Sequence, residues 1–507
     1  MKRVIVCAFF VLAFAKWAVA ANLDLFGDEA FYWQCGQRPA LTYIDHPPTT
    51  ALLVRLGSEL LGDSPLGVRS LFLVLGMVFP WLIYHLAHPL VGERDAWWAA
   101  GAALIIPAVA HLGLLAIPDV PMLVLTALFL LIFERATRGE ATAWWLSGLV
   151  GGLGLLTHYR FVLAPAAAFI YLTATRSGRR HWQHRGPWRL LPGLLLGLVP
   201  AVVYNTMHRF EPVRYYLAGR HGGQFDLENL LEGLAQQMLL VTPLLFAALV
   251  HTFAIVVQRA RCGDDRAALS AIFAGTHLGL FFLASPFEDS GLSTAHWPAP
   301  GYLALLPFLP ATLRAWARPA TAWRRGLATL APVSGALLLS ISLAGLAAWI
   351  QVGSLREPFT GWSEVADRAG VYLADLPAAP NGRAVVIGDH YKLGAQLDLA
   401  LHGSADVYSL DHRKNHAHGR APQFALWQRG EVDLRQRRGQ ALAVVELTQI
   451  RRGEQDAWIH HVASFFVTFE TLGDLRIESP GKRKKTKHFR FYRGTLADPA
   501  ETRQGAS

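Results

Sequence analysis

The chain has 507 residues, of which 52% are hydrophobic and only 17% are charged, and its mean hydropathy is +0.28. A soluble domain usually carries about 25% charged residues, so this composition excludes an ordinary soluble protein and predicts a membrane protein. The net charge of +10 does not indicate nucleic-acid binding, because the arginines gather between apolar blocks, as in cytoplasmic loops of membrane proteins. Three cysteines without a Cys-x-x-Cys pair predict neither a disulfide framework nor a zinc cluster.

The apolar blocks predict about eleven membrane-spanning helices, since several approach the roughly 20 residues that a helix needs to cross a bilayer. We place them at 4–22, 66–86, 96–116, 120–134, 142–157, 161–175, 190–206, 236–257, 268–284, 298–313 and 330–350. The basic start of the chain and an Ala-x-Ala sequence at 18–20 also fit a cleavable signal peptide. We favour an uncleaved first span, because Lys16 interrupts the apolar run and a polytopic protein needs this anchor.

Counting the spans places three arginine clusters on one side of the membrane. With the N-terminus inside, spans six, eight and ten end inside, and an arginine cluster follows each of them. The clusters are Arg176, Arg179, Arg180, Arg185 and Arg189; Arg259, Arg261 and Arg266; and Arg314, Arg318, Arg324 and Arg325. The count therefore predicts that residues 23–65, 207–235 and 285–297, with the turns near 118 and 159, face outward.

The first outward loop, residues 23–65, concentrates ionisable side chains directly after an apolar segment. It contains Asp28, Glu29, Arg38, Asp45 and His46. Ionisable groups at a membrane boundary are costly to desolvate and are functional candidates by default, and paired acids can supply a general base and a charge stabiliser. An acid pair can also cap a helix, and spacing alone leaves both interpretations open. Residues 49–61 predict an interfacial helix entered through two prolines.

Further polar candidates stand at the outer ends of later spans. They are Asp119 after Pro118, the sequence His158-Tyr159-Arg160, and His221 beside two glycines. Each has an ordinary structural alternative: a helix N-cap for Asp119, a plain loop position for His221, and a side chain that extends to the headgroups for Arg160, as also for Arg38.

From Arg356 onward the pattern changes to that of a small α/β domain. Residues 383–388, 442–447, 464–470 and 489–493 predict strands, and 391–402 predict a helix between the first strand and residues 407–408. The predicted fold is therefore a mainly α, polytopic membrane domain over residues 1–350, followed by a small α/β domain outside the membrane over residues 351–507.

The first loop resembles that of a known family. Residues 28–33, DEAFYW, followed by residues 43–48, YIDHPP, closely resemble the pattern DEAYYW…YFDHPP of bacterial GT-C glycosyltransferases, the relatives of protein O-mannosyltransferase and of the lipid A aminoarabinose transferase. Weaker similarities lie at residues 67–69, 118–121, 152–157 and 391–401. The resemblance covers most of the membrane region and touches the C-terminal part.

This resemblance implies an inverting transferase that takes a sugar from a polyprenyl-phosphate donor on the periplasmic face of the bacterial inner membrane. Asp28 would be the catalytic base, and Glu29 would assist it by orientation or charge. Asp45 and His221 match positions that in some relatives help to hold a divalent metal. His46 matches a position that contacts the donor phosphate.

The resemblance also places Asp119 at a second acidic position near the cavity. Many relatives have Lys where this chain has His158, and we expect Arg160 to supply the phosphate charge instead. His46 likewise stands where some relatives have Lys. Tyr159 and Arg38 complete the candidate donor-binding set.

The reaction requires these residue types independently of the family. Attack by a hydroxyl on an anomeric carbon needs a nearby base, and a departing phosphate needs Arg, His or a metal to stabilise its charge. The expected partners are the lipid-linked donor, an envelope glycolipid, glycan, lipid or protein as acceptor, and membrane lipids, but not nucleic acid. The sugar and the acceptor stay open.

Two other functional classes fit the sequence less well. A transporter or flippase of a lipid-linked sugar usually carries such polar groups in discontinuous spans of repeated halves, whereas here the acids cluster in one loop and no repeat is visible. A surface receptor that uses the C-terminal domain leaves the first loop unexplained.

Overall fold

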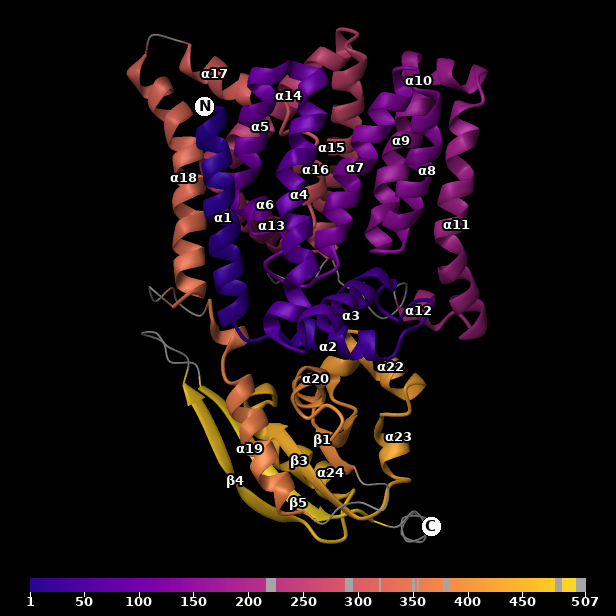
Figure 1. Ribbon diagram of the computed structural model, residues 1–507, viewed down its shortest axis with the longest axis vertical. Helices are drawn as coiled ribbons and strands as arrows, with labels where there is room; N and C mark the ends of the chain where they lie inside the picture. The colour runs from indigo at the N-terminus through magenta and orange to yellow at the C-terminus, as the bar shows by residue number, and fades with distance from the viewer. Residues whose placement is uncertain are drawn as a thin grey trace.

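The computed structural model describes residues 1–215, 225–287, 295–318, 321–348, 352, 355–376, 383–478 and 486–497. A bundle of apolar helices forms one part of the molecule, and a five-stranded sheet with flanking helices forms the other (Figure 1). Helices α2 (Gly27–Gln37) and α3 (Thr49–Leu61) lie between the two parts, across the end of the bundle. Helix α3 has the bounds predicted for the interfacial helix.

Seven helices in the described ranges are long and apolar enough to cross a membrane. They are α1 (Lys2–Asn22), α4 (Pro65–Val91), α7 (Asp119–Thr137), α11 (Gly186–Met207), α14 (Pro243–Arg261), α15 (Asp265–Ala284) and α18 (Ala322–Leu346). Each of them overlaps one predicted span, although the span predicted to begin at residue 236 starts inside a separate helix, α13 (Leu227–Val241). The expected polytopic, mainly helical architecture is confirmed.

The four other predicted spans are short helices or are broken in two. Helices α8 (Ala141–Leu155) and α9 (Leu163–Ala174) are apolar but short. Helix α5 (Glu93–Ile105) ends before Pro107, because proline disfavours helical backbone in the residue before it, and the single turn α6 (Pro107–Ala110) follows. Residues 298–313 divide into α16 (Ala299–Leu303) and α17 (Leu309–Ala317). For these four segments, membrane crossing stays a prediction.

Helices α8 and α11 approach closely through glycines. A Cβ atom at Gly152 would lie 2.2 Å from the carbonyl oxygen of Gly193, and one at Gly197 would lie 2.3 Å from the carbonyl oxygen of Gly152. Small residues four apart allow two helix backbones to meet in this way. The contact fixes the end of α8, from which the chain enters the turn that carries His158 and Arg160.

The arginine-rich connections and the C-terminal domain lie at opposite ends of the bundle. Helices α10 (Arg176–Arg180) and α17 stand at the end where the N-terminus lies, and α2, α3 and the sheet stand at the other end (Figure 1). The polar first loop is thus separated from the predicted cytoplasmic arginine clusters by the length of the bundle.

The C-terminal sheet has the strand order β2-β1-β3-β5-β4. Strands β1 (Ala384–Gly388), β2 (Ala405–Ser409) and β3 (Gln440–Glu446) are parallel, whereas β5 (Thr486–Thr495) is antiparallel to both β3 and β4 (Glu470–Glu478). The remaining helices of this domain include α19 (Trp362–Ala374), α20 (Tyr391–Ala400), α21 (Arg413–Ala417), α22 (Arg420–Leu426), α23 (Glu431–Leu434) and α24 (Gln455–Ala463).

Most of the predicted elements of the C-terminal domain are confirmed. Strands β1, β3 and β5 match the predicted ranges to within one residue or extend beyond them, and α20 is the crossover helix between β1 and β2 that parallel strands require. The strand predicted at 464–470 is wrong. Phe465 and Phe466 are buried against one face of the sheet in a turn after α24, with only an isolated bridge from Phe466 to Leu496, and β4 begins at Glu470.

Candidate active site

The start of α2 is anchored by Glu29, which is fully buried. Its carboxylate accepts hydrogen bonds from the backbone N–H of Phe26 and of Ala116, each at 2.8 Å. It also forms a two-point ion pair with Arg69, through Nε at 2.8 Å and Nη2 at 2.6 Å. Since Glu29 is enclosed in this way, its predicted assistance to the reaction can act only through the position of α2.

Arg69 extends this anchor to the end of the first span. Its remaining N–H groups donate to the carbonyl oxygens of Ala20, Leu23 and Asp24, at 2.9, 2.6 and 2.9 Å. One buried guanidinium thus connects the end of α1, the start of α2 and the body of α4. The first loop is therefore held in place at the first turn of α2, which carries Asp28.

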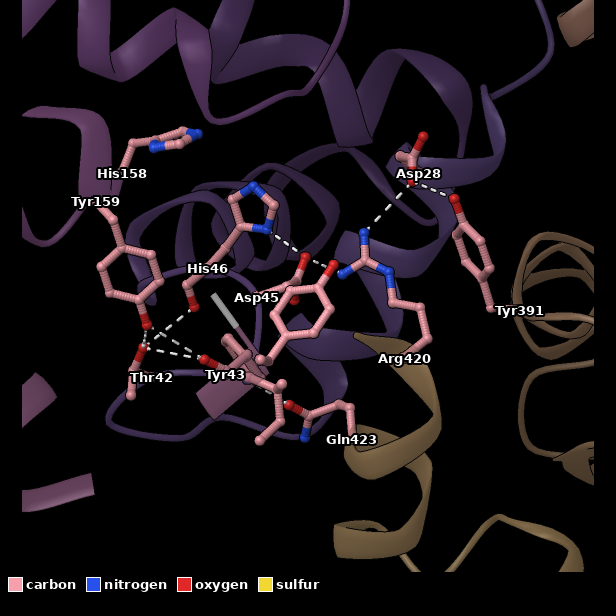
Figure 2. Close-up of polar contacts among 12 residues, drawn as sticks. Asp28, Thr42, Tyr43, Asp45, His46, His158, Tyr159, Tyr391, Arg420 and Gln423 are labelled. Carbon is pink, nitrogen blue, oxygen red and sulfur yellow. Dashed lines mark hydrogen bonds and ion pairs between the residues drawn. The ribbon is translucent and has the colours of Figure 1, made fainter. Parts of the chain in front are cut away.

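Asp28 reaches three side chains of the C-terminal domain, of which Figure 2 shows Tyr391 and Arg420. The Tyr391 hydroxyl donates to its Oδ1 at 2.8 Å, Arg420 Nη2 lies 3.4 Å from the same oxygen, and Lys392 Nζ lies 3.7 Å from Oδ2. The side chain of Asp28 is 22% exposed, whereas that of Glu29 is inaccessible. Of the two acids predicted to be catalytic, Asp28 is therefore the one that a substrate can reach.

The electrostatics of this group keep Asp28 ionised at neutral pH. Burial alone would raise the pKa of the carboxyl, but the charges of Lys392, Arg420 and His418 and the Tyr391 hydroxyl outweigh it and lower the pKa to about 2. Burial, together with the charge of Asp28, raises the pKa of Tyr391 well above its usual value, so this hydroxyl stays a donor. The carboxylate is thus an ionised acceptor in a defined orientation, but with so low a pKa it is a weak base in the free protein.

Asp45 and His46 continue this group toward the bundle. The Asp45 carboxylate is buried and contacts both Arg420 Nη1 and His46 Nδ1 (Figure 2). Burial opposes ionisation, but Arg420 and His46 hold the pKa of Asp45 far below its usual range. The His46 ring packs edge-to-face against Tyr32 and His158, with centroids 5.5 and 5.3 Å apart. His46 thus lies between the Asp28 group and the turn after α8.

The turn after α8 and the start of α7 form a second charged group. Arg160 forms an ion pair with Asp119, and His296 Nε2 lies 3.2 Å from the other carboxylate oxygen. The Arg160 guanidinium also lies over the ring of Trp297, 4.8 Å from its centroid. The N-cap position of α7 is occupied by Pro118, and Asp119 is the first residue of the helix, so Asp119 is not the N-cap.

His158 and Tyr159 support this turn. His158 Nδ1 accepts a hydrogen bond from the backbone N–H of Arg160 at 3.0 Å, and burial together with the charge of Arg160 lowers the pKa of His158 well below its usual value. The Tyr159 hydroxyl lies 3.2 Å from Thr42 Oγ1 (Figure 2). Through these contacts, the predicted residues His158, Tyr159 and Arg160 connect the first loop to the bundle.

One predicted site residue in the described ranges, Arg38, is not brought into this group. Arg38 turns to the C-terminal domain, where it pairs with Asp398 at 3.2 Å and lies over the ring of Trp427. This placement does not support the prediction that Arg38 contacts the donor phosphate, since the guanidinium serves the domain contact instead. His221 lies outside the described residues.

The cations around Asp28 come from a region that we did not select from the sequence. Tyr391 and Lys392 lie in the segment that resembles the family's C-terminal part, which is a signal that could have found them. No pattern around Arg420 indicates a role, because its contact with Asp28 joins residues nearly 400 positions apart. Gln396 and Gln423 hold the same domain in place by bonding to the backbone at Leu25 and Ile44, at 2.7 and 2.9 Å.

The predicted metal site at Asp45 does not fit this arrangement. Among the residues that the structure describes, no group of three or more His, Cys, Asp or Glu side chains is placed to hold a metal ion. The Asp45 carboxylate already contacts the guanidinium of Arg420. A divalent cation at this carboxylate would therefore face a positive charge at contact distance.

The N-terminus of α20, which carries Tyr391, is fixed by buried ionisable side chains at the ends of β1 and β3. His390 Nε2 lies 2.9 Å from Glu446 Oε2, and its Nδ1 accepts from the backbone N–H of Leu393 at 3.3 Å. The Glu446 backbone N–H donates to Asp389 Oδ2 at 3.1 Å. Asp389, His390 and Glu446 are all at most 1% exposed.

We expect Asp389→Asn to stabilise the protein at neutral pH. Burial raises the pKa of Asp389 from 3.8 to about 6. Between about pH 4 and 6 the folded chain holds a proton that the unfolded chain has lost, so the free energy of unfolding falls as pH rises. The neutral amide of asparagine has no such loss, so we expect the free energy of unfolding at pH 7 to be about 1–3 kcal/mol higher. Thermal unfolding in detergent across this range checks it, and a lower melting temperature at pH 7 would contradict it.

Comparison with known proteins identifies similar sequences. Residues 45–204 match the model of the family described as dolichyl-phosphate-mannose-protein mannosyltransferase. The lipid A galacturonosyltransferase RgtD of Rhizobium johnstonii is 27% identical over 254 residues, which are 47% of this chain and 52% of that protein. The match thus spans about half the length of this relative.

Solved structures resemble almost the whole chain. ArnT from Cupriavidus metallidurans bound to undecaprenyl phosphate has a TM-score of 0.63 at 15% identity, over 96% of this chain and 97% of that chain. An oligosaccharyltransferase from Archaeoglobus fulgidus in its apo form has a TM-score of 0.54 at 10% identity, over 95% and 74% of the two chains. The chain has the fold of these proteins, and its resemblance to the GT-C glycosyltransferases, predicted from the first loop, is confirmed.

Proposed function

We propose that this protein is an integral-membrane glycosyltransferase that transfers a sugar from a polyprenyl-phosphate donor to an acceptor hydroxyl at the periplasmic face of the bacterial inner membrane. One observation carries the proposal: the Asp28 carboxylate is ionised, partly exposed and oriented by Tyr391, Arg420 and Lys392 at the end of the bundle. The fold shared with ArnT, whose solved structure holds undecaprenyl phosphate, supports the donor class.

The proposed reaction inverts the sugar in one displacement. The acceptor oxygen attacks the anomeric carbon on the face opposite the phosphate, and its proton passes to the Asp28 carboxylate. The new carbon–oxygen bond forms as the bond from the anomeric carbon to the phosphate oxygen breaks. Polyprenyl phosphate leaves with the electron pair of that bond, and its added negative charge must be stabilised.

We assign the stabilisation of the phosphate to His46 and Arg160. Both belong to the connected group that begins at Asp28, and each is partly exposed. Arg160 binds Asp119 through Nη2, and 18% of its side chain is exposed, so the guanidinium can also face a phosphate. A guanidinium can hold a carboxylate and a phosphate oxygen together, since it carries five N–H donors in one plane.

We further propose a glycolipid of the lipid A type as the acceptor. The support is RgtD, named a lipid A galacturonosyltransferase, which is similar to half of this chain. A glycolipid acceptor and a polyprenyl-phosphate donor both reside in the membrane, and α2, which carries Asp28, lies between the bundle and the C-terminal domain (Figure 1). This placement is consistent with two membrane-borne substrates.

A transfer assay in detergent micelles tests the function. The purified protein is incubated with labelled polyprenyl-phosphate hexose, aminoarabinose or galacturonic acid and with lipid A as the acceptor. We expect labelled lipid A from at least one donor. A transporter of lipid-linked sugars would form no product, because micelles enclose no compartment, so the absence of transfer with all three donors would contradict the proposal for this acceptor.

A further inference from the structure

Arg420 joins the two acids of the first loop from the opposite domain. It begins α22, and its guanidinium contacts Asp45 through Nη1 and lies 3.4 Å from Asp28 through Nη2 (Figure 2). Only 3% of its side chain is exposed. The two carboxylates therefore share one buried cation, and this cation comes from the C-terminal domain.

Aromatic rings fix the orientation of this cation. The Arg420 guanidinium carbon lies 3.8 Å from the ring centroid of Phe31 and 5.1 Å from that of Tyr391. Cations are stabilised over aromatic faces, the more so where water is excluded. Phe31 is itself part of the DEAFYW sequence, so the segment that carries Asp28 also carries a platform for its partner.

Two neighbouring carboxylates repel each other unless a positive charge lies between them. In an active site a divalent metal can play this part, binding several oxygens at once. Arg420 offers two parallel N–H groups to two carboxylates, with the planar geometry for which arginine is suited and without exchangeable ligands. Its Nη1 contacts Asp45 Oδ2, an oxygen that a metal bound to this residue could otherwise use.

We propose that Arg420 is a positioning residue that replaces a divalent cation in this transferase, holding Asp28 and Asp45 in register so that sugar transfer needs no metal. This inference rests on the proposed function. Arg420 acts through the carboxylates and not on the sugar itself. Arg420 and Gln423 lie on the same helix, and Gln423 binds the backbone of the first loop. The contact between the C-terminal domain and the first loop therefore positions the Arg420 guanidinium at the two carboxylates.

The first test measures turnover and metal binding in the wild-type protein. We expect turnover to be unchanged by EDTA and by added Mn²⁺, and electron paramagnetic resonance to detect no Mn²⁺ bound at Asp45. Loss of turnover in EDTA with recovery on adding Mn²⁺ would overturn the inference while confirming the proposed function. Binding of Mn²⁺ that Asp45→Asn abolishes would also overturn it, whether or not the protein is active.

The second test removes the guanidinium. Arg420→Ala is expected to lower kcat about a hundredfold, with a smaller change in the KM of the donor, the usual scale for losing one fixed charge in an active site. Without the guanidinium, the carboxylates of Asp28 and Asp45 can share a cation, so we expect this variant to bind Mn²⁺ and to regain part of its turnover with it. Arg420→Lys should retain an intermediate rate, because an ammonium lacks the planar fork.

Arg429 provides the matched control. It belongs to the same domain, pairs with Asp406 at 3.0 Å and lies over the ring of Tyr408 at 5.1 Å, so Arg429→Ala loses the same kinds of contact inside the sheet. We expect its turnover to equal that of the wild type. Wild-type turnover in Arg420→Ala would overturn the inference. If Arg420→Ala fails to fold, Arg420→Lys is the deciding variant. Full activity of Arg420→Lys without any affinity for Mn²⁺ would also contradict the inference, because it would show that the planar guanidinium is not needed to hold the two carboxylates.

Discussion

Replacing Asp28 by asparagine is expected to lower the rate of sugar transfer by about 10²–10⁴, the usual contribution of a positioned base. The amide has the shape of the carboxylate and can still accept the hydrogen bond that Tyr391 donates at 2.8 Å. It cannot accept a proton, and it loses the ion pairs with Arg420 and Lys392. Initial rates with saturating donor in micelles measure the loss.

The control for this substitution is Asp63→Asn in the same loop. Asp63 is exposed and accepts a hydrogen bond from Trp33 Nε1 at 2.7 Å, which an amide can also accept. We expect Asp63→Asn to keep the wild-type rate and melting temperature. Asp28→Asn should fold but melt at a lower temperature at neutral pH, because the lowered pKa of Asp28 means that its ionised form stabilises the fold. Normal turnover by Asp28→Asn would remove the general base from the proposed mechanism.

Replacing Glu29 by alanine is expected to destabilise the fold by about 3–5 kcal/mol, because it leaves the guanidinium of Arg69 buried without its counter-charge. The backbone N–H groups of Phe26 and Ala116 lose their acceptor at the same time. The yield of monodisperse protein and its melting temperature in detergent should therefore fall steeply, and any loss of turnover should follow the loss of folded protein.

Two variants separate the ion pair from a general effect of removing an acid. Glu59→Ala removes an exposed glutamate that pairs with Arg55 at 2.7 Å on α3, and we expect no measurable change. Combining Glu29→Ala with Arg69→Met should recover part of the stability, since no unpaired charge is left buried. If Glu29→Ala kept the wild-type melting temperature but lost turnover, the side chain would have a direct part in the reaction.

The contrast between Asp28 and Glu29 shows how far the sequence could predict this site. The acidic pair at the start of a helix was recognisable, and so was the family pattern around it. Neighbouring residues on a helix point about 100° apart, so two adjacent acids cannot both face one substrate. Which of them faces the substrate depends on where Arg69, Ala116 and Tyr391 lie, and these contacts come from other elements.

Other features were predictable to the extent that they are local. The bounds of α3 follow from the prolines before it and the apolar period within it, and the long spans follow from their apolar blocks. The break before Pro107 and the turn at Phe465 were missed, because apolar residues fit a continuous helix, a strand or a packed turn equally well. The position of Arg420 depends on domain docking, which no local pattern encodes.

The buried contacts at Arg69 hold the start of α2 from the side of the helix bundle, whereas the charges that face Asp28 come from the C-terminal domain. Gene fusions that exchange this domain between relatives would therefore change the electrostatic environment of an unaltered base. Recombination of whole segments offers evolution, or an engineer, a route to new acceptors that leaves the lipid-facing helices untouched.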